Sequence, residues 1–230
     1  MFIRHDNTLK WKWIGYGALI TFALVLAGLL GCDKLMHSLI RSETCMGVSW
    51  EAIDSGILCS FAKIIGTLFT AKMWIIFTVL SVIAFFIYKA FTNEFDFRYA
   101  FIKIKNSYVF YIFCSVIMAC FATGILKVLI GRSRPFMYEA LGKTFFVPGS
   151  FEHMFNSMPS GHTAVSFAGL VMIGMLFPKI KWATWTMAII IGLSRIYVGA
   201  HWASDVILGA FIGMLCADFT KAILKKINSK

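Results

Sequence analysis

The sequence contains little charge. Only 14% of its 230 residues are Asp, Glu, Lys or Arg, whereas 59% are hydrophobic. A soluble domain carries roughly 25% charged residues, and a chain with so little charge does not cover a water-exposed surface. The composition therefore excludes an ordinary soluble domain. It predicts a single polytopic membrane domain over residues 1–230.

Acidic residues are the scarcer of the two signs, with 11 Asp and Glu against 22 Lys and Arg. In a soluble protein, a net charge of +11 would suggest nucleic-acid binding. Here the basic residues lie mainly between apolar stretches, where Lys and Arg anchor membrane helices and set their topology. We therefore expect the bilayer as a partner, and no nucleic acid.

The six cysteines lack the spacing of metal ligands. Cys114, Cys120 and Cys216 fall in apolar runs and are predicted to be small core residues. Cys45 and Cys59 share one connecting segment, which we place outside the cytoplasmic membrane. A disulfide in an oxidising compartment and two free thiols are both compatible with the sequence.

The first apolar run lacks a cleavage site. Residues 13–32 follow three basic residues, as a signal peptide would, but the run is longer than the apolar part of such a peptide. It ends at Asp33 and Lys34 rather than at small residues. We therefore predict a retained first helix.

A spanning helix needs ~20 apolar residues, because each residue rises ~1.5 Å across a core ~30 Å thick. The sequence predicts six such helices, at residues 13–32, 72–90, 106–126, 159–178, 181–197 and about 202–220. The predicted fold is thus an all-α membrane bundle of six transmembrane helices. Lys and Arg are in excess in the predicted inner segments, which places both termini in the cytoplasm. Residues 55–70 are predicted to form a helix at the interface.

Three polar clusters interrupt this apolar background, and the predicted topology puts all of them on the outer face. They are Lys127-x6-Arg134-Pro135, Pro159-Ser160-Gly161-His162 and Ser194-Arg195-x5-His201-x3-Asp205. Together they supply three cations, two histidines and one carboxylate, without an acidic pair that would hold a metal. We therefore expect neither a metal ion nor a cofactor.

The three cations favour a polyanion as ligand. Phosphate fits Lys127, Arg134 and Arg195, because Arg offers a planar fork to its oxygens and Lys a compact charge. The proline before Ser160 is typical of a helix start. Free N–H groups around Ser160 and Gly161 would then point at the anion. Taken singly, Lys127 and Arg195 could also be anchors that reach the interface.

The histidines predict covalent chemistry. His201 and Asp205 are four residues apart, so on a helix they share one face. A carboxylate that accepts a hydrogen bond from one imidazole nitrogen leaves the other nitrogen with a free lone pair. This favours His201 as nucleophile and His162, beside the anion-binding turn, as general acid. A lone histidine would more often be structural; the agreement of three separate segments favours a site.

The three clusters resemble the signature of the type-2 phosphatidic acid phosphatase family, which shares its site with vanadium haloperoxidases and class A acid phosphatases. The resemblance covers Lys127 to Asp205 without a departure from the pattern. It implies a helical bundle with a site near the outer membrane surface. It also implies roles for the site residues: Lys127, Arg134, Arg195, the Ser160 hydroxyl and the Gly161 N–H hold the phosphoryl oxygens, His201 becomes a phosphohistidine oriented by Asp205, and His162 protonates the leaving group.

The resemblance implies hydrolysis of a lipid phosphate or diphosphate. Bacterial members of the family act on lipid A, undecaprenyl diphosphate or phosphatidylglycerol phosphate, and lipid A is our first expectation. We expect a multi-pass protein of the inner membrane whose site faces the periplasm or exterior. A lipid phosphotransferase and a phosphate-binding transporter without turnover are the alternatives; haloperoxidase activity is least favoured, because the known enzymes of that type are soluble.

The long loop at residues 131–158 contains four phenylalanines, Phe145, Phe146, Phe151 and Phe155. They would either hold the loop against the membrane surface or pack onto the loop's own core. The sequence is compatible with both.

Overall fold

The computed structural model describes residues 2, 8–41, 45, 56–91 and 107–228. Its long helices coincide with the six predicted apolar ranges. They are α1 (Trp11–Ala27), α4 (Ala71–Phe91), α6 (Tyr108–Ile130), α8 (Gly161–Leu176), α9 (Lys181–Tyr197) and α10 (Ala203–Asn228). The shorter helices are η1 (Gly28–Cys32), α2 (Asp33–Ile40), α3 (Ile57–Leu68), α7 (Pro135–Leu141), η3 (His153–Phe155) and η4 (Pro178–Ile180). The prediction of an all-α membrane protein is confirmed.

Among the described residues, four helical stretches are long and apolar enough to cross a membrane: Trp11–Ile40, Ala71–Tyr88, Tyr108–Ile130 and Ala203–Ile227. α8 is also apolar but has only 16 residues. The count of six spans therefore stays a prediction. Residues 3–7 and 92–106, which hold the basic residues Arg4, Arg98, Lys103 and Lys105 of the predicted inner side, lie outside the described residues.

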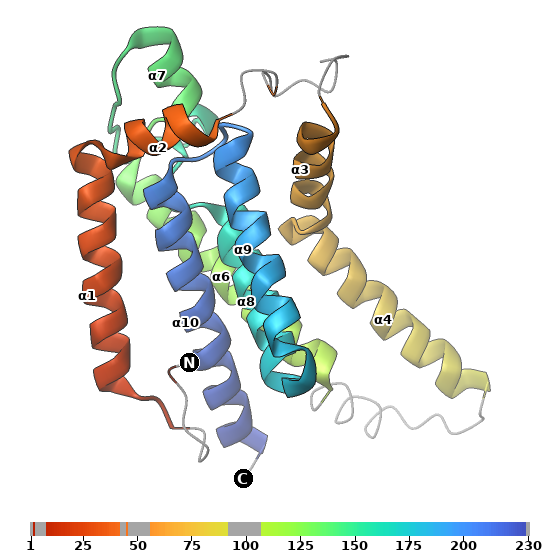
Figure 1. The fold of residues 1–230 in the computed structure, drawn as a ribbon. Helices are drawn as coiled ribbons and strands as arrows, with labels where there is room; N and C mark the ends of the chain where they lie inside the picture. Colours follow the sequence, from red (N-terminus) through yellow and green to blue (C-terminus); the bar gives the residue numbers. More distant parts are fainter. Residues whose placement is uncertain (1, 3–7, 42–44, 46–55, 92–106, 229–230) are drawn as a thin grey trace.

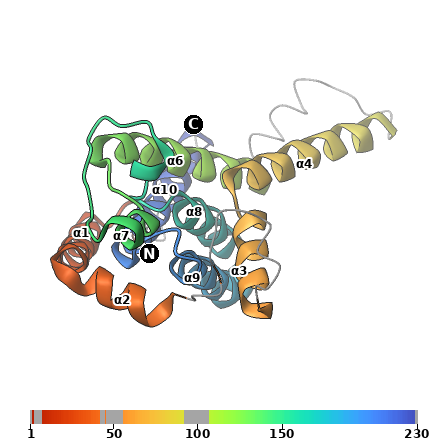
Figure 2. The same cartoon turned by 90° about the horizontal axis from the view of Figure 1, so that it is seen from above.

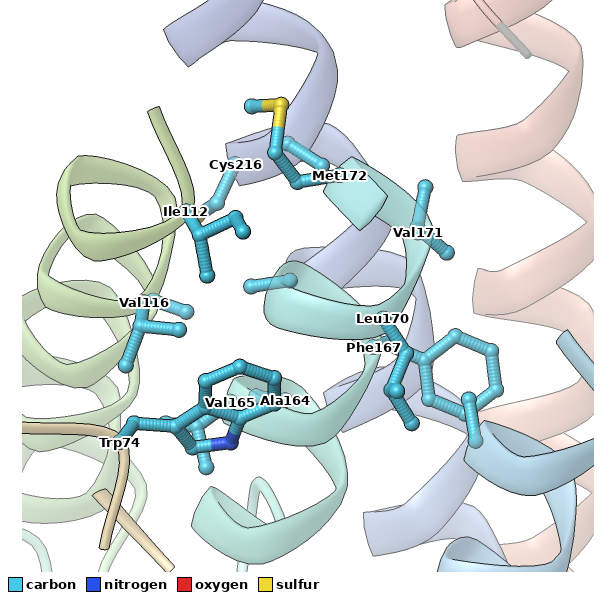
Figure 3. Close-up of a cluster of buried hydrophobic side chains, with 14 of the residues drawn as sticks. Trp74, Ile112, Val116, Ala164, Val165, Phe167, Leu170, Val171, Met172 and Cys216 are labelled. Carbon is cyan, nitrogen blue, oxygen red and sulfur yellow. The ribbon is translucent and has the colours of Figure 1, made fainter. Parts of the chain in front are cut away.

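Helix α8 forms the centre of the bundle. Figure 2 shows it surrounded by α6, α9 and α10, and Figure 3 shows its apolar side chains pointing into the core. Val171 and Met172 are completely buried. The backbones of α10 and α8 pack directly against each other at Gly213, where an added Cβ would overlap the Ala164 carbonyl and the Phe167 side chain. Close packing at small residues is the usual way in which membrane helices associate.

The chain turns sharply after α1. Gly31 has φ of 137°, a value that residues with a Cβ rarely adopt, and α2 then lies across the end of the bundle. Figure 1 shows that this end is opposite the start of α1 and the end of α10. As a result Asp33, at the start of α2, is turned inward and is only 3% exposed.

Helix α3 confirms the helix predicted within residues 55–70. It packs beside α9 (Figure 2), and its Cys59 forms a disulfide with Cys45. The pairing that the sequence left open is therefore present. After α3 the chain enters α4, which slants away from the bundle in both views (Figures 1 and 2). Near its start, Trp74 packs against α8 at Gly169.

Candidate active site

A pocket of about 470 Å³ opens between the first turn of α4 and the ends of α6 and α8. Its walls contain residues from all three predicted clusters. The lining residues are Thr70, Ala71, Lys72, Cys120, Thr123, Gly124, Lys127, Arg134, Gly161, His162, Val165 and His201. The two histidines thus face one shared cavity, which is the condition for both to act on one phosphoryl group.

Two of the predicted cations line the pocket and are held by backbone carbonyls. Lys127, in the last turn of α6, donates to the carbonyl oxygen of Asn156. Arg134 donates through Nε to the His153 carbonyl at 3.0 Å. Burial lowers the pKa of Arg134 from its ordinary value, against the attraction of the Asp205 carboxylate. Each side chain keeps N–H groups available for an anion.

The loop that supplies these carbonyls folds back on the end of α6. Gly131 ends the helix with φ of 61°, and a Cβ there would overlap the Val147 backbone. Val147 donates its N–H to the Gly131 carbonyl at 2.8 Å, and Ser157 donates to the Arg132 carbonyl at 3.0 Å. The chain after α6 and the chain before α8 are therefore fixed to each other, and Lys127 lies between them.

Ser160 and Gly161 begin α8, as predicted. The Ser160 Oγ caps the helix by accepting from the Thr163 backbone N–H, and it also accepts from the Thr163 hydroxyl at 2.9 Å; Ser160 is completely buried. Gly161 lines the pocket. The helix start is thus directed at the cavity through Gly161, while the Ser160 hydroxyl is engaged in the cap.

The expected geometry of His201 and Asp205 needs correction. They do not share a helix face, because α10 begins at Ala203 and His201 lies in the loop before it. His201 Nδ1 is 3.8 Å from Asp205 Oδ2, which is too long for a hydrogen bond. Oδ2 instead accepts from the Ser157 hydroxyl at 2.5 Å and from the Trp202 N–H at 3.0 Å. Asp205 therefore lies behind the imidazole as a fixed negative charge.

His201 is in the chemical form that a nucleophile needs. It is 2% exposed, and burial lowers its pKa to about 3, against the opposing effect of Asp205. The imidazole is therefore neutral at neutral pH. Since Nδ1 faces Asp205, Nε2 is the nitrogen that remains for a substrate.

Arg195 lies away from the pocket wall. Its guanidinium donates to the carbonyl of Ala62 on α3 and to the Ser194 hydroxyl, while it interacts electrostatically with His162. Gly66 provides the room, because a Cβ there would overlap the guanidinium. α3, which lies outside the three clusters, therefore sets the position of the third cation.

Sequence reasoning missed four buried polar residues next to Asp205. They are Asp33, Arg132, Ser157 and Ser204. Arg132 lies within the spacing of the first cluster, between Lys127 and Arg134, and Asp33 directly follows the first apolar run. The available signal was a charged side chain beside an apolar run, which is costly unless it is paired.

A family model described as the PAP2 superfamily matches residues 108–229, more than half of the chain. The chain is 38% identical over 103 residues to a lipid A 1-phosphatase from Rhizobium etli, a match that covers 45% of this chain and 44% of the relative. It is 31% identical over 101 residues to an undecaprenyl-diphosphatase from Sulfolobus acidocaldarius, covering 43% and 47%. The chain thus matches less than half the length of these curated relatives.

A solved structure has the same fold. The crystal structure of a phosphatidylglycerolphosphate phosphatase from Bacillus subtilis aligns with a TM-score of 0.62 at 19% identity, and the alignment covers 93% of this chain and 96% of that one. The family match contains all three clusters and the pocket walls that they form. The chain belongs to the PAP2 superfamily.

Proposed function

We propose that this protein is a membrane phosphatase that removes a phosphate group from a lipid head group. The observation that carries the proposal is that His162, His201, Lys127 and Arg134 line one pocket. Two imidazoles and two cations around one cavity can bind a phosphoryl group, attack it and protonate the group that leaves.

In the proposed reaction, Nε2 of neutral His201 attacks phosphorus. The bond between phosphorus and the lipid oxygen breaks, its electron pair stays on that oxygen, and His162 supplies the proton. The phosphohistidine is then attacked by water, which gives a proton to His162, and inorganic phosphate leaves His201. Lys127 and Arg134 neutralise the phosphoryl oxygens throughout, and the Gly161 N–H and Arg195 are proposed to assist them.

A lipid is the proposed substrate because part of the pocket wall is apolar and lies between helices. Ala71, Cys120, Gly124 and Val165 form this part of the wall. Among the relatives, the names lipid A 1-phosphatase and undecaprenyl-diphosphatase support a lipid phosphate or diphosphate. Lipid A is the first candidate, followed by undecaprenyl diphosphate and phosphatidylglycerol phosphate.

We propose that the site faces the periplasm or exterior across the inner membrane. The disulfide between Cys45 and Cys59 supports this orientation, because α3 carries Cys59 and also binds Arg195 at the site end of the bundle. Disulfides persist in oxidising compartments. The site end should therefore lie outside the cytoplasm.

We also propose that part of the 131–158 loop contacts the membrane surface. Phe151 is 83% exposed, as expected for a side chain that enters the interface. Phe146 instead has its ring centroid 5.9 Å from the Arg132 guanidinium. We therefore propose Phe151 as a membrane contact, while the Phe146 ring lies near a charged side chain of the same loop.

The decisive test is a screen for phosphate release by the purified protein in detergent. Lipid A, undecaprenyl diphosphate and phosphatidylglycerol phosphate are supplied singly, with His201→Ala as the matched inactive variant. Release that depends on His201 supports the proposal. Transfer of phosphate only when a second lipid is present would indicate a phosphotransferase, and binding of the lipids without turnover would indicate a transporter.

A further inference from the structure

A chain of buried charges runs from α2 to the carboxylate behind His201. Arg132 donates through Nη2 to Asp33 Oδ2 and through Nη1 to Asp205 Oδ1, both at 2.7 Å. Asp33, Arg132 and Asp205 are 3%, 2% and 0% exposed. The guanidinium therefore joins two carboxylates that are far apart in the sequence, one of which is 3.8 Å from the His201 ring.

Asp33 is fully committed to this arrangement. Its Oδ1 accepts the N–H of Ser204 at 2.9 Å, and its Oδ2 accepts the Ser204 hydroxyl as well as Arg132. Gly28 leaves the space, since a Cβ there would lie 2.7 Å from the Ser204 Cβ and 3.0 Å from both carboxylate oxygens. The position of Asp33 is thus determined by its place at the start of α2, by Ser204 in the first turn of α10 and by the space that Gly28 leaves.

We propose that Asp33 and Arg132 are positioning residues of the phosphatase reaction, in which Arg132 orients Asp205 and Asp33 balances the charge of Arg132. The inference rests on the proposed function. An Arg132–Asp205 pair alone would be neutral and would give little stabilisation to the cation that His201 becomes on phosphorylation. With Asp33 included, the side chains of Asp33, Arg132 and Asp205 carry one net negative charge, which stabilises the positive charge of the phosphorylated imidazole.

The fold itself gains little from this group. Burying ionic side chains costs desolvation, and apolar residues of similar volume often stabilise a protein equally well or better. The hydrogen bonds around Asp205 also favour a functional role. Its Oδ2 accepts from the Ser157 hydroxyl and the Trp202 N–H, and its Oδ1 accepts from Arg132, so that the orientation of the carboxylate is fixed. Asp33→Asn keeps the size of the side chain and one oxygen that can accept from Arg132 or Ser204, so this variant changes mainly the charge.

The test compares variants on dioctanoyl phosphatidic acid and dioctanoyl phosphatidylglycerol phosphate in detergent micelles. We expect Asp33→Asn to lower kcat about tenfold or more while KM stays within about twofold, because Lys127 and Arg134 still bind the phosphate. Asp218→Asn is the matched control: Asp218 is also completely buried on α10 but pairs with the Phe2 N–H near the opposite end. It should keep the kcat of the unaltered protein.

Variants of Arg132 test the other half of the proposal. Arg132→Gln removes the group that orients Asp205, so its kcat should fall about tenfold or more while KM stays within about twofold. Arg132→Lys keeps the charge and should lose less kcat than Arg132→Gln. Unaltered kcat in Asp33→Asn or in Arg132→Gln, or an Arg132→Lys protein no faster than Arg132→Gln, overturns the inference. If Asp33→Asn does not fold, the test rests on the two Arg132 variants with the same criteria.

The two proposals fail in different ways. An unaltered protein that releases no phosphate from any lipid in the screen contradicts the phosphatase function, and the positioning role falls with it. An active protein whose rate ignores Asp33 contradicts the positioning role alone.

Discussion

Helix α3 offers the sharpest test of how the site is assembled, at Gly66. A Cβ added there would overlap the Arg195 guanidinium, which is the far end of a flexible side chain and can move. Gly66→Ala should therefore leave the fold intact but displace Arg195 from the Ala62 carbonyl. The variant tests whether the position of this guanidinium, rather than its mere presence, matters for catalysis.

The expected size follows from the proposed hydrogen bond to the phosphoryl group that a displaced Arg195 would lose. A hydrogen bond to a charged group contributes about 1.5–3 kcal/mol, and each 1.36 kcal/mol is a factor of ten in rate. If Arg195 supports the phosphoryl group from its present position, kcat/KM should fall about 10- to 100-fold. The thermal midpoint in detergent should change by only a few degrees, because the side chain can relocate without opening the core.

The assay is phosphate release at several substrate concentrations, with thermal unfolding measured on the same samples. Gly15→Ala is the matched control, because a Cβ on Gly15 of α1 would meet nothing within 4 Å. Arg195→Lys is a second comparison, since it keeps the charge but loses the planar fork. A Gly66→Ala protein with the kcat/KM of the unaltered chain would refute the idea that α3 positions Arg195 for the reaction.

Three further predictions concern the nucleophile, the disulfide and metal ions. His201→Ala should abolish turnover while the protein stays folded. Because the pKa of His201 is about 3, the acid limb of the kcat/KM profile should lie at a pH well below the ordinary histidine range. An acid limb near pH 6.5 would contradict the buried neutral imidazole. Reduction of the Cys45–Cys59 disulfide, which has a sequence separation of 14, should lower the stability of the α3 segment by about 3 kcal/mol. The rate should also fall, because α3 binds Arg195. Thermal unfolding and phosphate release, each measured with and without reductant, would show both effects. Chelators should leave the rate unchanged, and a loss restored by a divalent ion would indicate different chemistry.

The same pKa fixes the sign of a stability effect. His201 binds a proton at about pH 6.5 in the unfolded chain but only near pH 3 in the folded one. Since the unfolded state then binds more protons between these values, this residue makes the fold less stable as the pH falls below about 6.5.

The sequence allowed the helices and the main site to be predicted because both depend on local patterns. Apolar runs placed α1, α4, α6, α8, α9 and α10, and motif spacing brought His162 and His201 to one pocket. The errors arose where a long-range contact decides the outcome. Nothing local indicates that Asp33 meets Arg132, 99 residues away, or that Arg195 turns toward α3. The spacing of His201 and Asp205 suggested a helix, but the helix begins between them.

One backbone hydrogen bond has a consequence for how substrates are selected. Ser160 donates its N–H to the Asp205 carbonyl at 2.9 Å, and a Cβ on Gly209 would overlap the Ser160 carbonyl, so the starts of α8 and α10 are joined. The half of the pocket that performs the chemistry is therefore rigid. The opposite wall contains Thr70, just before α4, and Lys72 in its first turn; neither belongs to the three clusters, and substitutions there are expected to change which head groups fit without disturbing either histidine.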